Sequence, residues 1–280
     1  MRQARVPTDP RLFYGIIGGA GGDSAFAFST LNYNLHTHST FCDGAGTPEQ
    51  MVAAALEKGF AALGFSSHSD MVADIDAYKS EVRRLGGKYA GRIRILCGIE
   101  AEYDTGFARG DLDYVIGSAH YITAPDGARF AFDHTPQILA DGIRDHFRGD
   151  SAAFVRAYYA QEREMIRGYD CDIVGHIDLV RKFNAKHPWL DENAPWYLDE
   201  LERTADALAA SGKPVEVNTG AISRGWMDDV YPSRRFRDAL RSRGVRFVLS
   251  SDAHSAHALD CAFDRFGGCE DFVRPPWSAL

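Results

Sequence analysis

Two histidines and an aspartate lie near the start of the chain, at His36, His38 and Asp43. Residues 31–35 precede them and predict a short strand. Because side chains on a strand alternate between its two faces, both histidines point to the same side. Neutral imidazole is the commonest metal ligand in proteins, and a nearby carboxylate can reach a second ion. The spacing therefore favours a metal site at the end of a strand, although a His-x-His pair taken alone also fits two ordinary loop histidines.

Apolar runs that end in a residue able to bind metal recur along the chain. The runs at 61–65, 93–99, 113–119, 172–175 and 245–251 lead in turn to His68, Glu100, His120, His176, and the pair Asp252 and His254. A further run at 213–217 leads to Asn218. The other four histidines fall in predicted helices or loops. Histidines scattered at random would not be expected to fall at strand ends. We therefore interpret these six residues, together with His36, His38 and Asp43, as nine metal ligands.

Amphipathic helices are predicted between these runs, over residues 47–59, 75–89, 151–167, 197–210 and 233–242. The first begins with a capping box, formed by Thr47 and Gln50 around Pro48. Strands that alternate with helices form parallel sheets, and about seven such units indicate an α/β barrel. The strands of such a barrel end at one mouth, where active sites lie. Nine ligands at one mouth exceed the three or four of a single catalytic ion, which predicts a multinuclear site.

Composition narrows the class of protein further. The chain has 280 residues, 45% of them hydrophobic, which is enough for one sizeable core. We expect a glycine-rich, flexible extension at 1–30, preferred over a signal peptide, and a single barrel domain at 31–280. The net charge is -8 and the 31 basic residues form no long run, which argues against nucleic-acid and membrane partners. The five cysteines contain no Cys-x-x-Cys pair, which favours a reduced, cytoplasmic protein.

The motifs occur in the order of a known superfamily. His-Thr-His-Ser, Ser-Ser-His-Ser-Asp, Gly-Ile-Glu-Ala-Glu, Gly-Ser-Ala-His-Tyr-Ile, Gly-His-Ile-Asp-Leu-Val-Arg-Lys-Phe, Glu-Val-Asn-Thr and Ser-Asp-Ala-His resemble the polymerase and histidinol phosphatase (PHP) superfamily. The resemblance is closest to the histidinol-phosphate phosphatase branch and covers about 34–266. It implies a distorted, TIM-like (β/α)7 barrel of the PHP type with three divalent metal ions.

The resemblance also assigns the ligands. His36, His38, Glu100 and Asp252 hold the first ion, Glu100 bridges to the second with His120 and His176, and Asp43, His68 and His254 hold the third. Paired ions lower the pKa of a bridging water from about 15.7 towards 7, so we expect hydroxide to attack phosphorus. Asp252 or His254 is the candidate general acid for the leaving alkoxide, with water as the alternative. Mixed nitrogen and oxygen ligation suits zinc, iron or manganese and leaves the metal open.

The implied activity is hydrolysis of a phosphate monoester, with L-histidinol phosphate as the expected substrate in histidine biosynthesis. Arg181 and Arg224 are the expected phosphate-binding residues, with surface ion pairs as the alternative for each. Glu102 and Asp104 are weaker candidates for binding the substrate's ammonium group. Two other functions stay open: a PHP phosphoesterase acting on nucleotides or other small phosphate esters, and an accessory module acting on nucleic acid, which the acidic balance disfavours. The oligomeric state is not predicted.

Overall fold

The computed structural model describes residues 32–267 and residue 272, so the expected extension at 1–30 lies outside the described residues. Its centre is a sheet of seven parallel strands that follow one another in chain order. They are β1 (Tyr33–Asn34), β2 (Ala62–Phe65), β3 (Arg94–Glu102), β4 (Tyr114–Ser118), β7 (Ile173–Val174), β8 (Val215–Asn218) and β9 (Phe247–Ser250). Thr37 pairs with Ala253 just past the ends of β1 and β9 and brings the two edges of the sheet together. The predicted seven-stranded barrel is confirmed.

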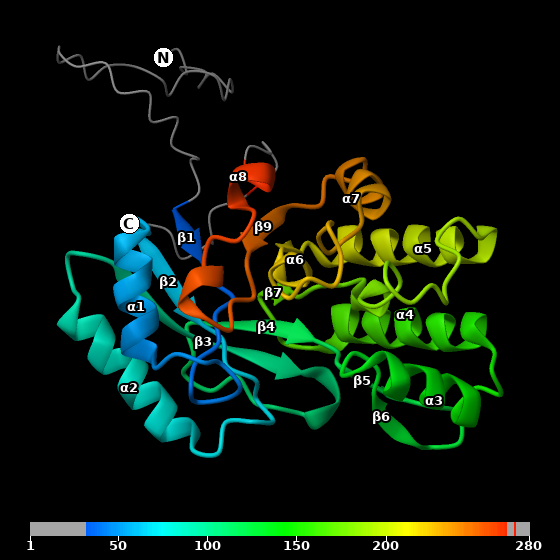
Figure 1. Ribbon diagram of the computed structural model, residues 1–280, viewed down its shortest axis with the longest axis horizontal. Coiled ribbons are helices and arrows are strands. Elements are labelled where there is room, and N and C mark those ends of the chain that lie inside the picture. The colour runs from blue at the N-terminus through cyan, green and yellow to red at the C-terminus, as the bar shows by residue number, and fades with distance from the viewer. Residues whose placement is uncertain (1–31, 268–271, 273–280) are drawn as a thin grey trace, which may run out of the picture.

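Helices cover the outside of this barrel. They are α1 (Pro48–Glu57), α2 (Ile75–Lys88), α3 (Pro136–His146), α4 (Ser151–Gly168), α5 (Pro195–Ser211), α6 (Gly220–Ser223), α7 (Arg234–Arg241) and α8 (Phe263–Phe266). Short 3-10 helices lie at Tyr103–Thr105, Leu179–Arg181 and Ala256–Ala258. Helices α1 and α2 lie on one side of the barrel, and α4 packs beside α5 on the other (Figure 1). No helix in the described ranges is long and apolar enough to cross a membrane.

The predicted helix starts follow from local chemistry. The side chain of Thr47 accepts a hydrogen bond from the Gln50 amide (3.2 Å), and the Gln50 side chain accepts one from the Thr47 amide (2.8 Å). These two bonds satisfy amides that the first turn of a helix leaves without partners. Helix α1 ends at Glu57, two residues before the predicted Gly59, which has a φ of +77°. The predicted capping box is confirmed.

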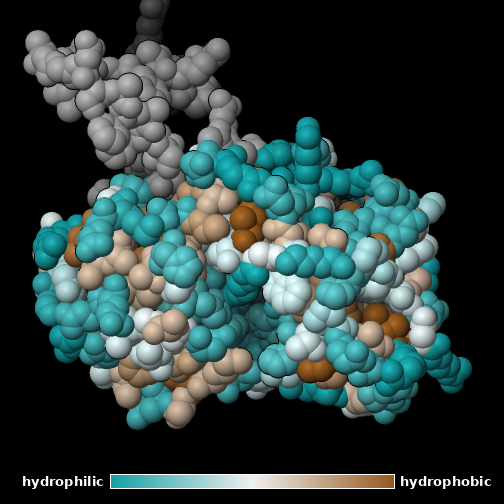
Figure 2. Space-filling view, in the orientation of Figure 1, coloured by the Kyte–Doolittle hydropathy of each residue, from teal (hydrophilic) through white to brown (hydrophobic). Residues whose placement is uncertain are grey.

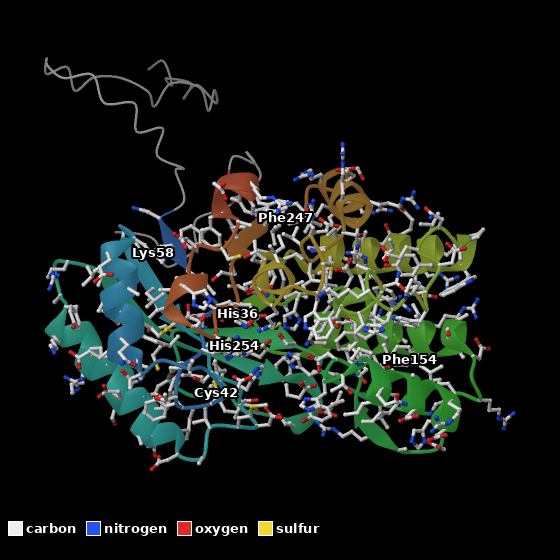
Figure 3. All side chains as sticks on the ribbon, in the orientation of Figure 1. His36, Cys42, Lys58, Phe154, Phe247 and His254 are labelled. Atoms are coloured by element: carbon white, nitrogen blue, oxygen red, sulfur yellow. The ribbon has the colours of Figure 1, made fainter. Side chains whose placement is uncertain are left out.

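An insertion between β4 and α4 was not predicted. It contains an antiparallel hairpin of β5 (Tyr121–Thr123) and β6 (Arg129–Ala131), followed by α3. Strands of three residues are too short to show a period of two in the sequence, which explains the omission. The fully buried ring of Phe154 on α4 holds the insertion in place, because it contacts Phe130 of the hairpin (6.2 Å between ring centres) and Phe147 (5.4 Å) (Figure 3).

The inside of the barrel is filled below its mouth. Tyr114 is fully buried there and donates hydrogen bonds to the carbonyls of Leu35 (2.5 Å) and Phe65 (3.0 Å). A Cβ atom at Gly98 would lie 2.3 Å from the Tyr114 ring, so glycine at this position makes room for the phenol. Tyr114 thus fills the barrel beneath its C-terminal mouth, and the next side chain of β3 on the same face as Gly98 is Glu100.

Candidate metal centre

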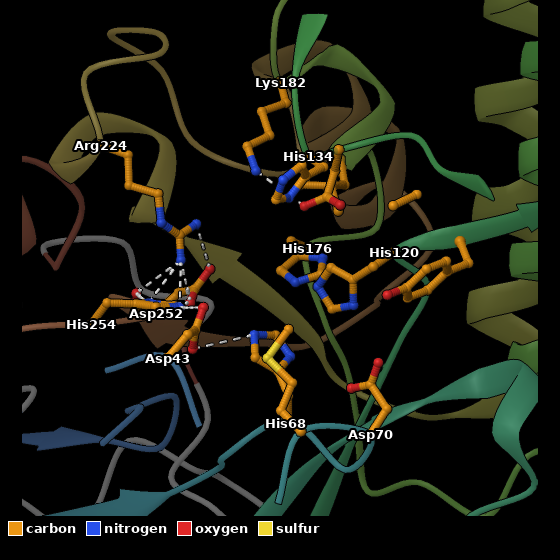
Figure 4. A pocket seen from close by; sticks show the side chains of 15 residues that line it. Asp43, His68, Asp70, His120, His134, His176, Lys182, Arg224, Asp252 and His254 are labelled. Atoms are coloured by element: carbon orange, nitrogen blue, oxygen red, sulfur yellow. Dashed lines mark hydrogen bonds and ion pairs between the residues drawn. The ribbon is translucent and has the colours of Figure 1, made fainter. Parts of the chain in front are cut away.

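All nine predicted ligands meet at the C-terminal mouth of the barrel. His36, His38 and Asp43 follow β1, His68 follows β2, Glu100 lies in β3, His120 follows β4, His176 follows β7, and Asp252 and His254 follow β9. We call these nine residues the metal rim. Figure 2 shows a hydrophilic hollow in the middle of this face, and Figure 4 shows labelled rim side chains pointing into the pocket. The positions of the strand ends are therefore sufficient to gather these side chains in one place.

Glu100 lies at the centre of the rim and is 1% exposed. Its Oε2 atom is 3.1 Å from Nε2 of His36 and 3.0 Å from Nδ1 of His68. Its Oε1 atom is 2.9 Å from Nε2 of His176 and 3.4 Å from Nε2 of His120. Burial raises the pKa of Glu100, but the surrounding histidines lower it by more. The pKa therefore lies well below its usual value. Each oxygen thus faces different histidines, as a carboxylate that bridges two cations must.

Three overlapping groups of potential ligand atoms lie close enough to share an ion. They are His36 with His38 and Asp252; His68 with Glu100 and His120; and His38 with Asp43, His68 and His254. The ligand atoms within each group lie within 4.8 Å of one another. This grouping resembles the expected assignment, but His38 and His68 each belong to two groups. The described residues thus offer room for several ions, and the division of the ligands among them stays a prediction.

Two buried nitrogens fit a metal better than any other partner. Nε2 of His36 and Nε2 of His38 are buried and form no hydrogen bond with any described residue. Asp252 Oδ1 lies 3.2 Å from Nε2 of His38 and 3.7 Å from Nε2 of His36. A buried imidazole nitrogen that faces a carboxylate without a hydrogen bond is costly, whereas a cation placed among these nitrogens and carboxylates would satisfy them all. The donor set, imidazole plus carboxylate, suits zinc, iron or manganese.

Two glutamates outside the rim orient its histidines. Nδ1 of His36 lies 2.7 Å from Oε1 of Glu216, and Nδ1 of His120 lies 2.9 Å from Oε2 of Glu102. A carboxylate on Nδ1 fixes the tautomer and the ring angle and leaves Nε2 free for a metal. Sequence reasoning missed Glu216, although an acid inside an apolar strand was the available signal. The structure does not support the suggestion that Glu102 meets the substrate.

Asp104 likewise has another partner, because Arg129 pairs with it at 2.8 Å. Both acids suggested for the ammonium group are therefore engaged in contacts within the protein.

Cys42 touches the rim, with its Sγ atom 3.4 Å from Nδ1 of His38, and burial raises the pKa of its thiol. Cys42 is thus half-buried and fits a small side chain that packs against the rim.

Asp252 is held by Arg224. Nη2 of Arg224 donates to Oδ1 of Asp252 at 2.9 Å and lies 2.9 Å from Nδ1 of His254. Asp252 has a φ of +51°, a left-handed conformation that aspartate tolerates better than most residues. A Cβ atom at Gly220 would lie 2.8 Å from its Oδ2 atom, so the adjoining glycine makes room for the carboxylate. The predicted Arg224 thus lies in the pocket, where it contacts the rim directly.

Arg181 is not brought into the pocket. Its guanidinium is 8% exposed and pairs with Glu192 (2.6 Å), Asp178 (3.4 Å) and Asp229 (3.5 Å). It belongs to a buried ion-pair network, which is closer to the ion-pair alternative than to phosphate binding. The expectation that Arg181 contacts the substrate therefore finds no support in the geometry.

Lys182, the next residue, lines the pocket instead. Its side chain points into the pocket (Figure 4), and its Nζ atom donates to Oδ2 of Asp133, another lining residue, at 3.0 Å. Sequence reasoning did not select Lys182, because the run Leu-Val-Arg-Lys-Phe places two adjacent cations at a turn whose direction the sequence does not fix. The pocket thus has two cationic side chains, Lys182 and Arg224, near the rim.

A parallel barrel whose strand ends gather histidines and carboxylates defines a class of metal-binding barrel. The PHP domain family matches residues 34–220. A Deinococcus radiodurans protein named "Probable histidinol-phosphatase" is 32% identical over 242 residues, which are 78% of this chain and 85% of that protein. The chain therefore belongs to the PHP domain family.

Two solved structures share the fold. HisK from Listeria monocytogenes superimposes with a TM-score of 0.74 at 19% identity, over 84% of this chain and 99% of that one. The histidinol phosphate phosphatase of Lactococcus lactis, complexed with zinc, L-histidinol and phosphate, gives a TM-score of 0.61 at 18% identity, over 86% and 95%. These likenesses confirm the barrel and its predicted PHP type.

Proposed function

We propose that this protein is a histidinol-phosphate phosphatase, which hydrolyses L-histidinol phosphate to L-histidinol and phosphate in histidine biosynthesis. The observation that carries the proposal is the convergence of nine ligand side chains around Glu100, with Arg224 and Lys182 beside them. A relative that is 32% identical over most of both chains bears a histidinol-phosphatase name, which supports the same activity. The chain is thus a hydrolase of phosphoric monoesters, and its partner is a small phosphate ester.

The rim is suited to three divalent ions. His36, His38, Glu100 and Asp252 would hold the first, Glu100, His120 and His176 the second, and Asp43, His68 and His254 the third. When bound, such ions make a water molecule acidic enough to supply hydroxide at neutral pH and neutralise the charge of a phosphate ester. Zinc, iron and manganese all fit this mixed donor set.

The protein's own side chains bind and orient the substrate. Arg224 and Lys182 present cationic donors at the pocket, which suits phosphate oxygens. Arg224 also holds Asp252 in place, and Glu216 and Glu102 hold His36 and His120. Of the two expected proton donors, His254 is the better placed, because its side chain is 23% exposed at the pocket and that of Asp252 is 5% exposed. Both residues are also expected metal ligands, and a ring nitrogen that binds an ion has no proton to give. We therefore propose that water supplies the proton to the leaving alkoxide, with His254 as the more accessible of the two side chains.

The test is phosphate release from L-histidinol phosphate, compared with release from a panel of nucleotides and other small phosphate esters. We expect kcat/KM to be highest for L-histidinol phosphate, and metal analysis of the same preparation to find about three ions per chain. A preference for a nucleotide would instead favour a PHP phosphoesterase of different substrate class.

A further inference from the structure

One carboxylate in the pocket has no opposite charge beside it. The others are paired: Asp43 with His254 (3.1 Å), Asp133 with Lys182 (3.0 Å) and Asp252 with Arg224 (2.9 Å). Asp70 lines the same pocket but makes neither a hydrogen bond nor an ion pair with any residue that the structure describes. Its side chain is exposed at the pocket. The pocket thus has an unpaired negative charge at this point.

The backbone holds Asp70 at a fixed place beside the rim. The residue lies in the turn after β2, where the Ser69 amide donates to the carbonyl of Glu100 at 2.9 Å and the Met71 amide donates to the carbonyl of His68 at 3.1 Å. Both anchoring carbonyls belong to rim residues. The main chain on both sides of Asp70 is therefore anchored to the rim, so the turn needs no further ordering before the carboxylate can meet a ligand.

The charges in the pocket are separated in space. Lys182 and Arg224 enter from one side, and Asp70 enters from the opposite side, beyond His68 and His120 (Figure 4). A phosphate ester that also carries an ammonium or imidazolium group has the same separation of charges. When its phosphate lies at the rim near the two cations, its positive group can extend towards Asp70.

Two less polar side chains flank Asp70 in the pocket. Met71 is 48% exposed and is one of two exposed large apolar side chains in the described part of the chain, the other being Ile138 at 37%. Tyr121 also lines the pocket, and burial together with the nearby charge of Asp70 raises the pKa of its phenol. A thioether and a phenol ring provide contact surface for carbon atoms or an imidazole ring of a substrate.

We propose that Asp70 binds the cationic group of the substrate and so selects phosphate monoesters that bear an ammonium or imidazolium group. The inference rests on the proposed function, because it requires the phosphate to lie at the metal rim. It replaces Glu102 and Asp104, whose carboxylates are engaged by other residues, as the acid that faces the substrate.

The experiment measures kcat/KM for phosphate release by the metal-loaded wild type and by Asp70→Asn. The substrates are L-histidinol phosphate, phosphoethanolamine, which has an ammonium group but no ring, and 4-nitrophenyl phosphate, which has no cationic group. We expect Asp70→Asn to lower the ratio of kcat/KM for L-histidinol phosphate to that for 4-nitrophenyl phosphate about tenfold. Asp170→Asn is the matched control, because this side chain is 81% exposed and lies outside the pocket.

The two proposals fail in different ways. An unchanged ratio in Asp70→Asn, for L-histidinol phosphate and for phosphoethanolamine alike, would overturn the role of Asp70. Failure of the wild type to cleave L-histidinol phosphate, while it cleaves the other two esters, would overturn the proposed substrate. In that case a lower ratio for phosphoethanolamine in Asp70→Asn would still support selection of cationic esters. Asp70→Lys should lower each ratio further than Asp70→Asn, since it repels the same cation.

Discussion

The metal rim and the loop between β7 and α5 hold their charged side chains in different ways. In the rim, main-chain pairing does the positioning: the His38 amide donates to the carbonyl of Ala253 at 2.9 Å, and the Ala253 amide donates to the carbonyl of His36 at 3.1 Å. In the loop, side-chain contacts position the segment: the Asn184 side chain accepts a hydrogen bond from the Leu190 amide at 3.0 Å, and Arg181 pairs with surrounding acids. The rim keeps buried nitrogens available for a ligand, whereas the loop satisfies its charges internally.

Because of this difference, we expect substitutions in the rim to reduce mainly activity and substitutions in the loop to reduce mainly stability. A rim carboxylate contributes little to the fold beyond its own strand, so its loss falls on metal binding and catalysis. An ion pair in the loop holds a segment together, so its loss falls on the folded state, and the pocket changes only through Lys182. Substitutions in the two regions can therefore be distinguished by what they change most.

The largest effect is expected for Glu100→Gln. The amide keeps the size of the side chain but removes a charge that lies within 3.5 Å of five histidines, so we expect the rim to hold cations poorly. We expect kcat/KM for L-histidinol phosphate to fall by about a thousandfold or more. Phosphate release and metal content measured on the same preparation check this. Full metal occupancy with normal activity would contradict the central place given to Glu100.

The second prediction compares the substitution of two arginines, Arg224 in the pocket and Arg181 in the loop. Arg224→Ala removes a cationic donor from the pocket, and we expect kcat/KM of the metal-loaded protein to fall about a hundredfold. The buried carboxylate of Asp252 also loses its arginine, but ions at the rim would compensate its charge, so the loss of stability should be the smaller of the two. Arg181→Ala instead leaves Asp178 and Glu192 buried or half-buried without their cation, and we expect it to lower the free energy of unfolding by about 3 kcal/mol.

Urea denaturation and phosphate release, measured on both arginine variants, separate these outcomes. The comparison of the two regions fails if Arg181→Ala reduces kcat/KM as strongly as Arg224→Ala at a temperature where both proteins are folded.

A third, smaller effect is expected for Glu216→Gln. Glu216 accepts from the backbone amide of His176 (3.2 Å) and from Asn218 (2.9 Å) besides its contact with His36. An amide in its place must turn its NH2 group towards one of these donors. We expect metal affinity to fall about 10- to 100-fold, with a smaller change in activity at saturating metal.

Metal titration of activity after dialysis checks the prediction for Glu216. Glu200→Gln is the matched control, because Glu200 is also buried and paired, with Arg163 at 2.7 Å, but it lies on α5 away from the rim. Equal metal affinities for the two variants would show that Glu216 does not position His36.

The rim could be predicted from the sequence because its residues are tied to strand ends. An apolar run fixes where a strand stops, and in a parallel barrel that fixes the neighbourhood of the next residue, as for His120 and His176. The ion-pair loop could not be predicted in this way. A 3-10 turn rotates by about 120° per residue, so the difference between Arg181 and Lys182 depends on the tertiary contacts of the turn.

The roles of Glu216, Glu102 and Asp70 were equally out of reach. Which nitrogen of a histidine faces a carboxylate, and which acid has no cation beside it, depend on side-chain positions that neither periodicity nor motif order contains. The sequence therefore predicted which elements meet at the pocket but not how their polar groups are paired there.

The last prediction compares two glycines, one in β3 beneath the rim and one in α2, and the smallest effect of all is expected for the second. In Gly98→Ala the new methyl group would meet the Tyr114 ring at 2.3 Å, and we expect the free energy of unfolding to fall by about 3 kcal/mol. Gly87 lies in α2, and a Cβ atom placed there would have nothing within 4 Å. Gly87→Ala should therefore raise the free energy of unfolding by about 0.5 kcal/mol, because alanine favours a helix. Urea denaturation of both variants measures the two shifts.

Gly98→Ala also tests whether the rim depends on the position of β3. Gly98 and Glu100 lie two residues apart on β3 and face the same side of the strand, so a shift of β3 away from Tyr114 would also move the Glu100 carboxylate. We therefore expect Gly98→Ala to lose activity as well as stability, unlike Arg181→Ala, which loses mainly stability. Unaltered kcat/KM in folded Gly98→Ala would mean that the rim tolerates movement of its strands, against the view that main-chain pairing fixes the ligands.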